Sequence, residues 1–113
     1  MPKKIYTAYL TGIAGNSVGI FLIGDGIIVG ADIGGLTYDG NFSVSSDGSL
    51  EGVVQFSVPA GGQLISGLKA TEDQTITTPV KLPRGFDDGR AVTRIDTPAG
   101  PVNARFDFIR EVQ

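Results

Sequence analysis

The sequence predicts an all-β fold, and composition, residue alternation and turn signals all favour it. Glycine supplies 17 of the 113 residues, and Val, Ile and Thr are common, a composition that favours short strands joined by turns over helices. In the middle of the chain, polar and apolar residues alternate with a period of two, which is the side-chain period of a strand. Because 41% of the residues are hydrophobic and 19% are charged, we expect one packed domain spanning residues 1–113.

The first strands are predicted from apolar segments that glycine-containing turns separate. A strand over residues 4–11 ends at a turn in residues 12–16. Residues 17–23 and 27–31 then form a hairpin, because the Gly-Asp-Gly between them tolerates the left-handed backbone of a tight turn. Both segments are almost entirely apolar, so we expect each of their faces to be covered.

Alternation is clearest in residues 37–58 and predicts a second hairpin there. Asp47-Gly48 lies near its centre and predicts a two-residue type I′ turn, in which both central residues need a positive φ. The inward faces of its two strands are predicted to carry Tyr38, Gly40, Phe42 and Val44, followed by Leu50, Gly52, Val54, Phe56 and Val58.

Proline and glycine divide the rest of the chain. Residues 63–70 are expected to form one helical turn, and residues 75–82 a strand. Pro79 lies within that strand and has no N–H to donate, which places it at a sheet edge or a bulge. After a loop, residues 90–97 and 102–110 form the last hairpin. Its second strand is predicted to turn inward Val102, Ala104, Phe106 and Phe108.

The number and order of these elements predict the architecture. About eight short strands in meander order close most economically into an antiparallel up-and-down barrel. Closure removes the exposed sheet edges that would otherwise pair with other chains. A sandwich of two sheets is the alternative arrangement of the same strands.

Missing residue types exclude several classes of chemistry. The chain has no cysteine and no histidine, which excludes thiolate nucleophiles, Ser-His-Asp triads and the usual zinc sites. We therefore expect a protein that is not an enzyme and holds no cofactor or metal. The net charge of −3 comes without a basic stripe, which disfavours direct nucleic-acid binding. No apolar run approaches the ~20 residues of a membrane span, and no signal peptide is apparent, so we expect no membrane association and a cytoplasmic location.

Asp32 lies in the motif most similar to a catalytic one. Residues 29–35 resemble the hydrophobic-Asp-Thr/Ser-Gly signature of retroviral-type aspartic proteases, whose two subunits each bring one Asp to a shared proton. Ile33 stands where that signature has a hydroxyl residue. We therefore interpret Asp32 as a strand end followed by a glycine turn.

Three further groups of residues have simple interpretations. The glycine-rich segment 12–19 has neither the Lys nor the following helix of a phosphate-binding loop, which favours a β-turn. Five acids lack the alternate spacing of a calcium loop and are interpreted as turn residues: Asp25, Asp39, Asp47, Asp87 and Asp88. Arg94 and Arg105 either pair with Asp96 and Asp107 across the last hairpin, or join Arg90 in an anion-binding groove.

The first half of the chain carries a family resemblance. Ile5-Tyr6, the glycine-apolar strand of residues 18–22, the Gly-Asp-Gly turn, the strand of residues 27–33 and Tyr38-Asp39-Gly40 together resemble the GrlR-like family. Its best-known members are negative regulators of type III secretion gene expression in enteric bacteria. The resemblance implies a lipocalin-like barrel, usually a homodimer, that binds a transcriptional activator protein. In that family a run of four acids in the hairpin after the Tyr-x-Gly strand contacts the activator, and this chain has one acid there, Asp47.

Two functions from different classes are compatible with such a barrel. As a protein-interaction or regulatory module, the chain would form a homodimer through exposed apolar residues and bind a regulatory partner; the residues predicted for these contacts are Asp47, Val53 and Ile109. As a binding module, it would hold a small apolar ligand among Tyr38, Phe42, Val54, Phe56, Phe106 and Phe108. Aromatic side chains bury ~150–250 Å² each and are expected to fill the interior, which favours the first function. A connected cavity above ~300 Å³ would favour the second.

Overall fold

Eight strands form the secondary structure of residues 2–113, the part of the chain that the computed structural model describes. The strands are β1 (Lys3–Gly12), β2 (Gly15–Gly24), β3 (Ile27–Asp32), β4 (Thr37–Val44), β5 (Leu50–Val58), β6 (Gln74–Leu82), β7 (Thr93–Thr97) and β8 (Gly100–Val112). These residues contain no helix, so the predicted all-β class is confirmed.

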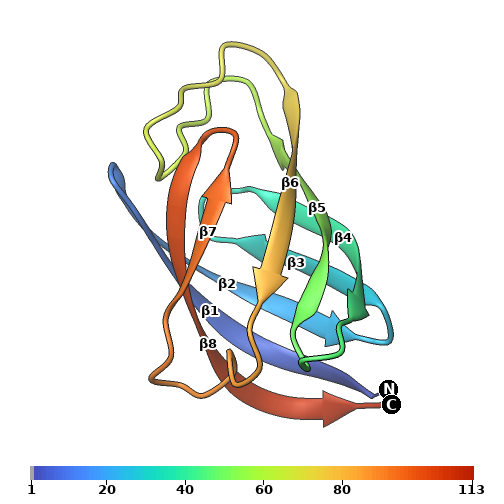
Figure 1. The fold of residues 1–113 in the computed structure, drawn as a ribbon. Helices are drawn as coiled ribbons and strands as arrows, with labels where there is room; N and C mark the ends of the chain where they lie inside the picture. The colour runs from blue at the N-terminus through green and yellow to red at the C-terminus, as the bar shows by residue number, and fades with distance from the viewer. Residues whose placement is uncertain (1) are drawn as a thin grey trace.

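The strands form one antiparallel sheet in the order β6-β5-β4-β3-β2-β1-β8-β7. Except for β6 and β7, strands that follow one another in the chain are paired, and β1 also pairs with β8. The sheet therefore curls until its two edges meet, and it forms the nearly closed barrel of Figure 1. The predicted up-and-down barrel is confirmed.

The seam is the line along which β6 and β7, the two edge strands, lie side by side. Within residues 2–113 no backbone ladder joins them, but the hydroxyl of Thr78 donates to the carbonyl oxygen of Asp96 at 3.4 Å. Pro79 lies in β6. Its place on an edge strand confirms the prediction made from its missing N–H.

The type I′ turn lies between β2 and β3 and not, as predicted, between β4 and β5. Asp25 and Gly26 have φ values of 51° and 78°, so both central positions are left-handed, as that turn requires. Between β4 and β5 only Gly48 has a positive φ and the connection is longer than two residues, so the predicted type I′ turn is wrong. The Asp47 carboxylate instead holds this loop by accepting hydrogen bonds from the N–H (3.0 Å) and hydroxyl (2.6 Å) of Ser49.

The lid loop, residues 59–73, covers the end of the barrel at the top of Figure 1. Gln63 and Lys69 form an isolated β-bridge, and Gly67 between them has a φ of 101°. The helical turn expected over residues 63–70 is therefore wrong, because the backbone reverses direction at a left-handed glycine. A small apolar cluster packs the loop onto the barrel: Leu36, Phe56, Val58, Leu64 and Ala70.

The plug loop, residues 83–92, connects β6 to β7 at the opposite end of the barrel. Its Phe86 is only 8% exposed. The Phe86 ring lies 5.8 Å from the Tyr6 ring and 5.4 Å from the Phe106 ring, measured between centroids. Burial of this one side chain closes that end of the interior.

The outward face of β1, β2 and β3 carries several exposed apolar side chains, and the Arg105 guanidinium lies 4.2 Å from the centroid of the Tyr9 ring. Tyr9, Ile20 and Val29 are 41%, 52% and 41% exposed. Within residues 2–113 the barrel interior covers one face of β2 and β3, and the other face stays exposed, so the expectation that both faces are covered is not met within a single chain. We call Tyr9, Ile20 and Val29 the outer apolar face.

Candidate functional site

A cavity of about 340 Å³ lies inside the barrel and extends to the lid loop. All eight strands contribute to its walls, mainly through Leu10, Phe21, Ile23, Ile28, Tyr38, Val54, Phe56, Val80, Leu82, Ile95, Val102, Ala104 and Phe106. At the lid end the walls are completed by Ile33, Gly34, Leu36, Gln63, Leu64, Ile65 and Ser66. The expectation that aromatic rings fill the interior is therefore wrong.

The rings leave this space because they lie against the wall or gather at the plugged end. Gly30 pairs with Phe21 on one side and with Tyr38 on the other, and these two rings lie 4.9 Å apart, measured between centroids. A Cβ atom at Gly30 would lie 2.6 Å from the Phe21 ring, so the absent side chain lets that ring lie flat on the wall. Tyr6 and Phe106 pack around Phe86 at the plug loop.

The residues predicted to line the interior mostly do so. The residues that line the cavity are Tyr38, Val54, Phe56 and Phe106. Phe42 packs against the main core cluster but does not reach the cavity. The inward prediction for Phe108 is wrong, since this residue is 54% exposed.

Phe108 keeps the alternation of its strand but lies beyond the closed end of the barrel. Its ring packs edge to face with the Tyr6 ring, with 6.1 Å between the two ring centroids. The Lys4 Nζ lies 5.9 Å from the centroid of the Phe108 ring. The pairing of β1 with β8 shifts register between Ile5 and Tyr6 at this point. Alternation assigns a face to Phe108, whereas the length of the barrel decides whether that face is covered.

Asp32 ends β3 at the cavity and organises the turn that follows. Its Oδ1 accepts hydrogen bonds from the N–H groups of Gly34 (2.9 Å) and Leu36 (3.2 Å), and its Oδ2 accepts one from the Tyr38 hydroxyl (2.7 Å). Both carboxylate oxygens are thus engaged within the chain. This geometry is that of a strand end followed by a glycine turn, the interpretation preferred from the sequence.

Two tyrosine hydroxyls are buried against carboxylates. Burial raises the pKa of Tyr38 far above its ordinary range, and the hydrogen bond to Asp32 and the charge of Asp32 act in the same direction. Burial also raises the pKa of Tyr6, and the charge of Asp87 and the 3.3 Å hydrogen bond to it raise it further. Both phenols therefore remain neutral hydrogen-bond donors.

Ser17 and Ser66 carry buried hydroxyl oxygens with no hydrogen-bond partner among residues 2–113. Both residues line the cavity, Ser17 from the start of β2 and Ser66 from the lid loop. Neither serine was among the residues predicted from the sequence. Ser17 could have been found, because it is in alternation with Phe21 and Ile23, whereas nothing in the sequence marks a loop residue such as Ser66.

The residues predicted for partner binding are exposed but lie on different elements. Val53 is on β5 and Ile109 on β8, and they are 48% and 49% exposed. These two strands are not neighbours in the sheet. Asp47 is exposed in the β4–β5 loop, where the hydrogen bond from the Ser49 hydroxyl lowers the pKa of its carboxyl. The three residues therefore do not share one surface formed by neighbouring strands.

The arginines pair along their own segments rather than across the hairpin. Arg94 contacts Asp96 at 2.9 Å and Arg105 contacts Asp107 at 2.9 Å. The strand register places Asn103, not Asp107, opposite Arg94, so the predicted cross-strand pairing is wrong. Arg90 similarly contacts Asp88 at 3.5 Å.

Other candidates give no second site in the described residues. Residues 2–113 bring together no group of three or more metal-ligating side chains. A hollow on the outer side of β4 and β5 includes Asp39, Glu51 and Val53 and is open to solvent. The described residues also include no helix of the length and apolarity needed to cross a membrane.

Comparisons of this chain with protein-family models, with curated proteins and with solved structures gave no match. The candidate site therefore has to be interpreted from its own geometry.

Proposed function

We propose that the barrel binds a small, largely apolar molecule in its interior. The observation that carries this proposal is the cavity of about 340 Å³ with apolar side chains from every strand. Ligand sites for small molecules usually measure ~300–1,000 Å³ and combine apolar walls with a few polar groups. The size and lining of this cavity thus favour the binding module over a solid interaction module.

The ends of the barrel differ in a way that suits ligand exchange. The plug loop closes one end through Phe86, a single aromatic side chain held by two other rings. The other end is covered by the glycine-containing lid loop, whose residues line the cavity directly. The seam offers a second approach, because Val80 of β6 and Ile95 of β7 line the cavity where no ladder joins the strands.

A fluorescent apolar probe tests the proposal. N-phenyl-naphthylamine is neutral and gains fluorescence in apolar surroundings, so we expect it to bind saturably with one site per chain. Val102 lines the cavity from β8, and Val102→Phe should weaken binding of the probe at least ~10-fold by occupying its space. Val53→Phe is the matched control, because the same substitution on the outer side of β5 should leave the affinity unchanged.

Val80→Phe provides a second blocking variant in case Val102→Phe folds poorly, since Val80 lines the cavity from the opposite side of the seam. Circular dichroism of each variant shows whether the barrel is intact. Failure of the wild-type protein to bind the probe saturably, or equal affinities in folded Val102→Phe and Val53→Phe, would refute the proposal.

A second candidate function is supported by the outer apolar face. The resemblance to GrlR-like regulators implies homodimerisation, which would bury Tyr9, Ile20 and Val29. The exposed apolar residues on other strands are scattered and do not form a comparable face. We expect light scattering at micromolar concentration to give a dimer that Ile20→Lys disrupts. Val44→Lys, at an exposed residue of β4, is the control. A monomeric wild-type protein would exclude this second function.

A further inference from the structure

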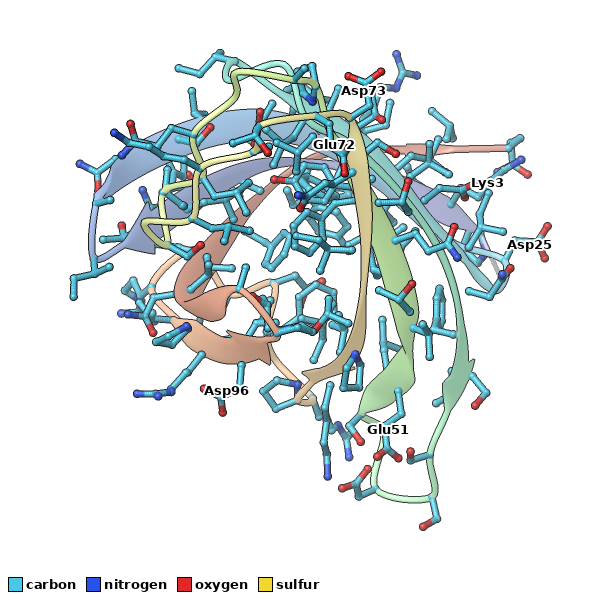
Figure 2. The ribbon with its side chains drawn as sticks, turned by 90° about the horizontal axis from the view of Figure 1, so that it is seen from above. Lys3, Asp25, Glu51, Glu72, Asp73 and Asp96 are labelled. Atoms are coloured by element: carbon cyan, nitrogen blue, oxygen red, sulfur yellow. The ribbon has the colours of Figure 1, made fainter. Side chains whose placement is uncertain are left out.

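The cavity walls carry almost no charge. Among its lining residues there is no lysine and no arginine, and Asp32 is the one acid. Figure 2 shows labelled charged residues such as Lys3, Asp25, Glu51 and Asp96 at the periphery of the barrel, away from its interior. A ligand carboxylate placed in the cavity would therefore lose its hydration without gaining a cation as partner.

Asp32 does not change this conclusion, because its oxygens already accept three hydrogen bonds. Gly34, Leu36 and Tyr38 supply the donors. A cationic ligand would have to compete with these bonds, and an anionic ligand would be repelled. The electrostatics of the site thus favour a ligand without net charge.

The hydroxyls of Ser17 and Ser66 belong to the few polar groups of the lining, which also include the side chains of Asn16 and Gln63. The Oγ atoms of Ser17 and Ser66 are buried without a partner in the described chain, and a hydroxyl can both donate and accept. The other hydroxyls in the lining are already engaged: Thr78 donates to backbone carbonyls, and Thr97 donates to Gly100 and accepts from the Ala99 N–H. A buried hydroxyl without a partner is unfavourable, so a ligand oxygen at the lid end would be stabilised there.

Both serines lie at the same end of the cavity. The Ala14 N–H donates to the Ile65 carbonyl oxygen at 2.6 Å, which fixes the lid loop beside the turn from which β2 and Ser17 start. Away from this end the walls are apolar, with Ile23, Ile28 and Leu82 among them. A ligand therefore has its polar group under the lid and its apolar part toward the plug.

We propose that the cavity selects a neutral amphiphile, an aliphatic chain with one terminal hydroxyl or carbonyl group that hydrogen-bonds to Ser17 and Ser66, and that it rejects the corresponding carboxylate. This inference rests on the proposed function and adds the class of ligand. It concerns how the cavity discriminates between head groups attached to the same aliphatic chain, which binding of an apolar probe alone does not address.

Displacement of N-phenyl-naphthylamine by decanol and by decanoate tests the inference. At pH about 8 decanoate is ionised, and the two compounds share chain length, so the head group is the difference between them. We expect decanol to bind at least ~10-fold more tightly than decanoate. The double substitution Ser17→Ala with Ser66→Ala should weaken decanol ~3-fold to ~10-fold and leave the affinity of the probe unchanged.

The matched control is Ser43→Ala with Ser57→Ala, because these serines are exposed on β4 and β5. This control should leave the affinity for decanol unchanged. Decanoate binding as tightly as decanol, no displacement by either compound, or an unchanged decanol affinity in the Ser17/Ser66 variant would overturn the inference while the proposed function stands. Absence of saturable probe binding to the wild-type protein would overturn both.

Discussion

Phe86 offers the most direct test of how the barrel is closed. The side chain belongs to the plug loop and is 8% exposed, with the Tyr6 and Phe106 rings at centroid distances of 5.8 Å and 5.4 Å. Phe86→Ala removes a buried ring that the surrounding rings cannot replace. Such substitutions lower the free energy of unfolding by about 3–5 kcal/mol, and the loss of two aromatic pairs places this one in the upper half of that range.

Urea unfolding followed by far-ultraviolet circular dichroism measures the effect. A domain of this size is stabilised by about 5–15 kcal/mol, so the Ala variant should unfold at a much lower urea concentration or fail to fold. Phe86→Leu keeps part of the volume and should lose only about 1–2 kcal/mol, which keeps the effect measurable. Val92→Ala is the control on the same loop, since Val92 is 63% exposed and should change stability by less than about 0.5 kcal/mol. A loss below about 1 kcal/mol for Phe86→Ala would refute the reasoning that this ring closes the barrel.

Three further predictions follow from the tyrosines, Gly30 and Asp32. Tyr6 and Tyr38 have raised pKa values in the folded state, so above pH about 10 the unfolded chain loses protons that the folded chain keeps. Each tyrosine should therefore lower the free energy of unfolding by about 1.4 kcal/mol for every pH unit above that value. Urea titrations in alkaline buffers should show a shallower decline in Tyr6→Phe, and an identical decline would contradict this assignment. Gly30→Ala should lower the free energy of unfolding by about 1–3 kcal/mol, because the new Cβ would lie 2.6 Å from the Phe21 ring and 2.8 Å from the backbone oxygen of Ile20. Thermal unfolding within error of wild type would contradict this expectation. Asp32→Ala should lower the free energy of unfolding by about 1.5–3 kcal/mol. Combined with Tyr38→Phe, it should lower it by less than the sum of the two single losses, because both substitutions remove the same hydrogen bond. Strict additivity in this double-mutant cycle would argue against that hydrogen bond.

The sequence predicted the features that depend on local pattern. Alternation predicted the inward face of β5, where Val54 and Phe56 are buried, but the inward prediction for Val44 at the end of β4 is wrong, since Val44 is 55% exposed. The missing N–H of Pro79 predicted an edge strand or a bulge, and Pro79 lies on an edge strand. Features that depend on where strands end relative to one another were missed. Phe108 has the periodicity of an inward residue, but it lies beyond the point where the plug loop covers the barrel.

The cavity could not be predicted from the sequence for a related reason. The volume left inside a barrel depends on ring orientation, and Gly30 allows the Phe21 ring to lie along the wall instead of across the interior. Composition counts aromatic rings without giving their direction. Ser66 reaches the site only because the lid loop folds over the barrel end, and this folding joins residues far apart in the sequence.

The pairing of β1 with β8 brings the two ends of the polypeptide together. Lys3 lies opposite Val112, so a short linker could join the termini, and new ends could be opened in the loop between β6 and β7. In such a circular permutant, strands would follow one another along the chain in the same order as across the sheet. The pairing that now spans almost the whole chain would become a local hairpin, and the lower contact order should make this barrel fold faster than the natural connectivity does.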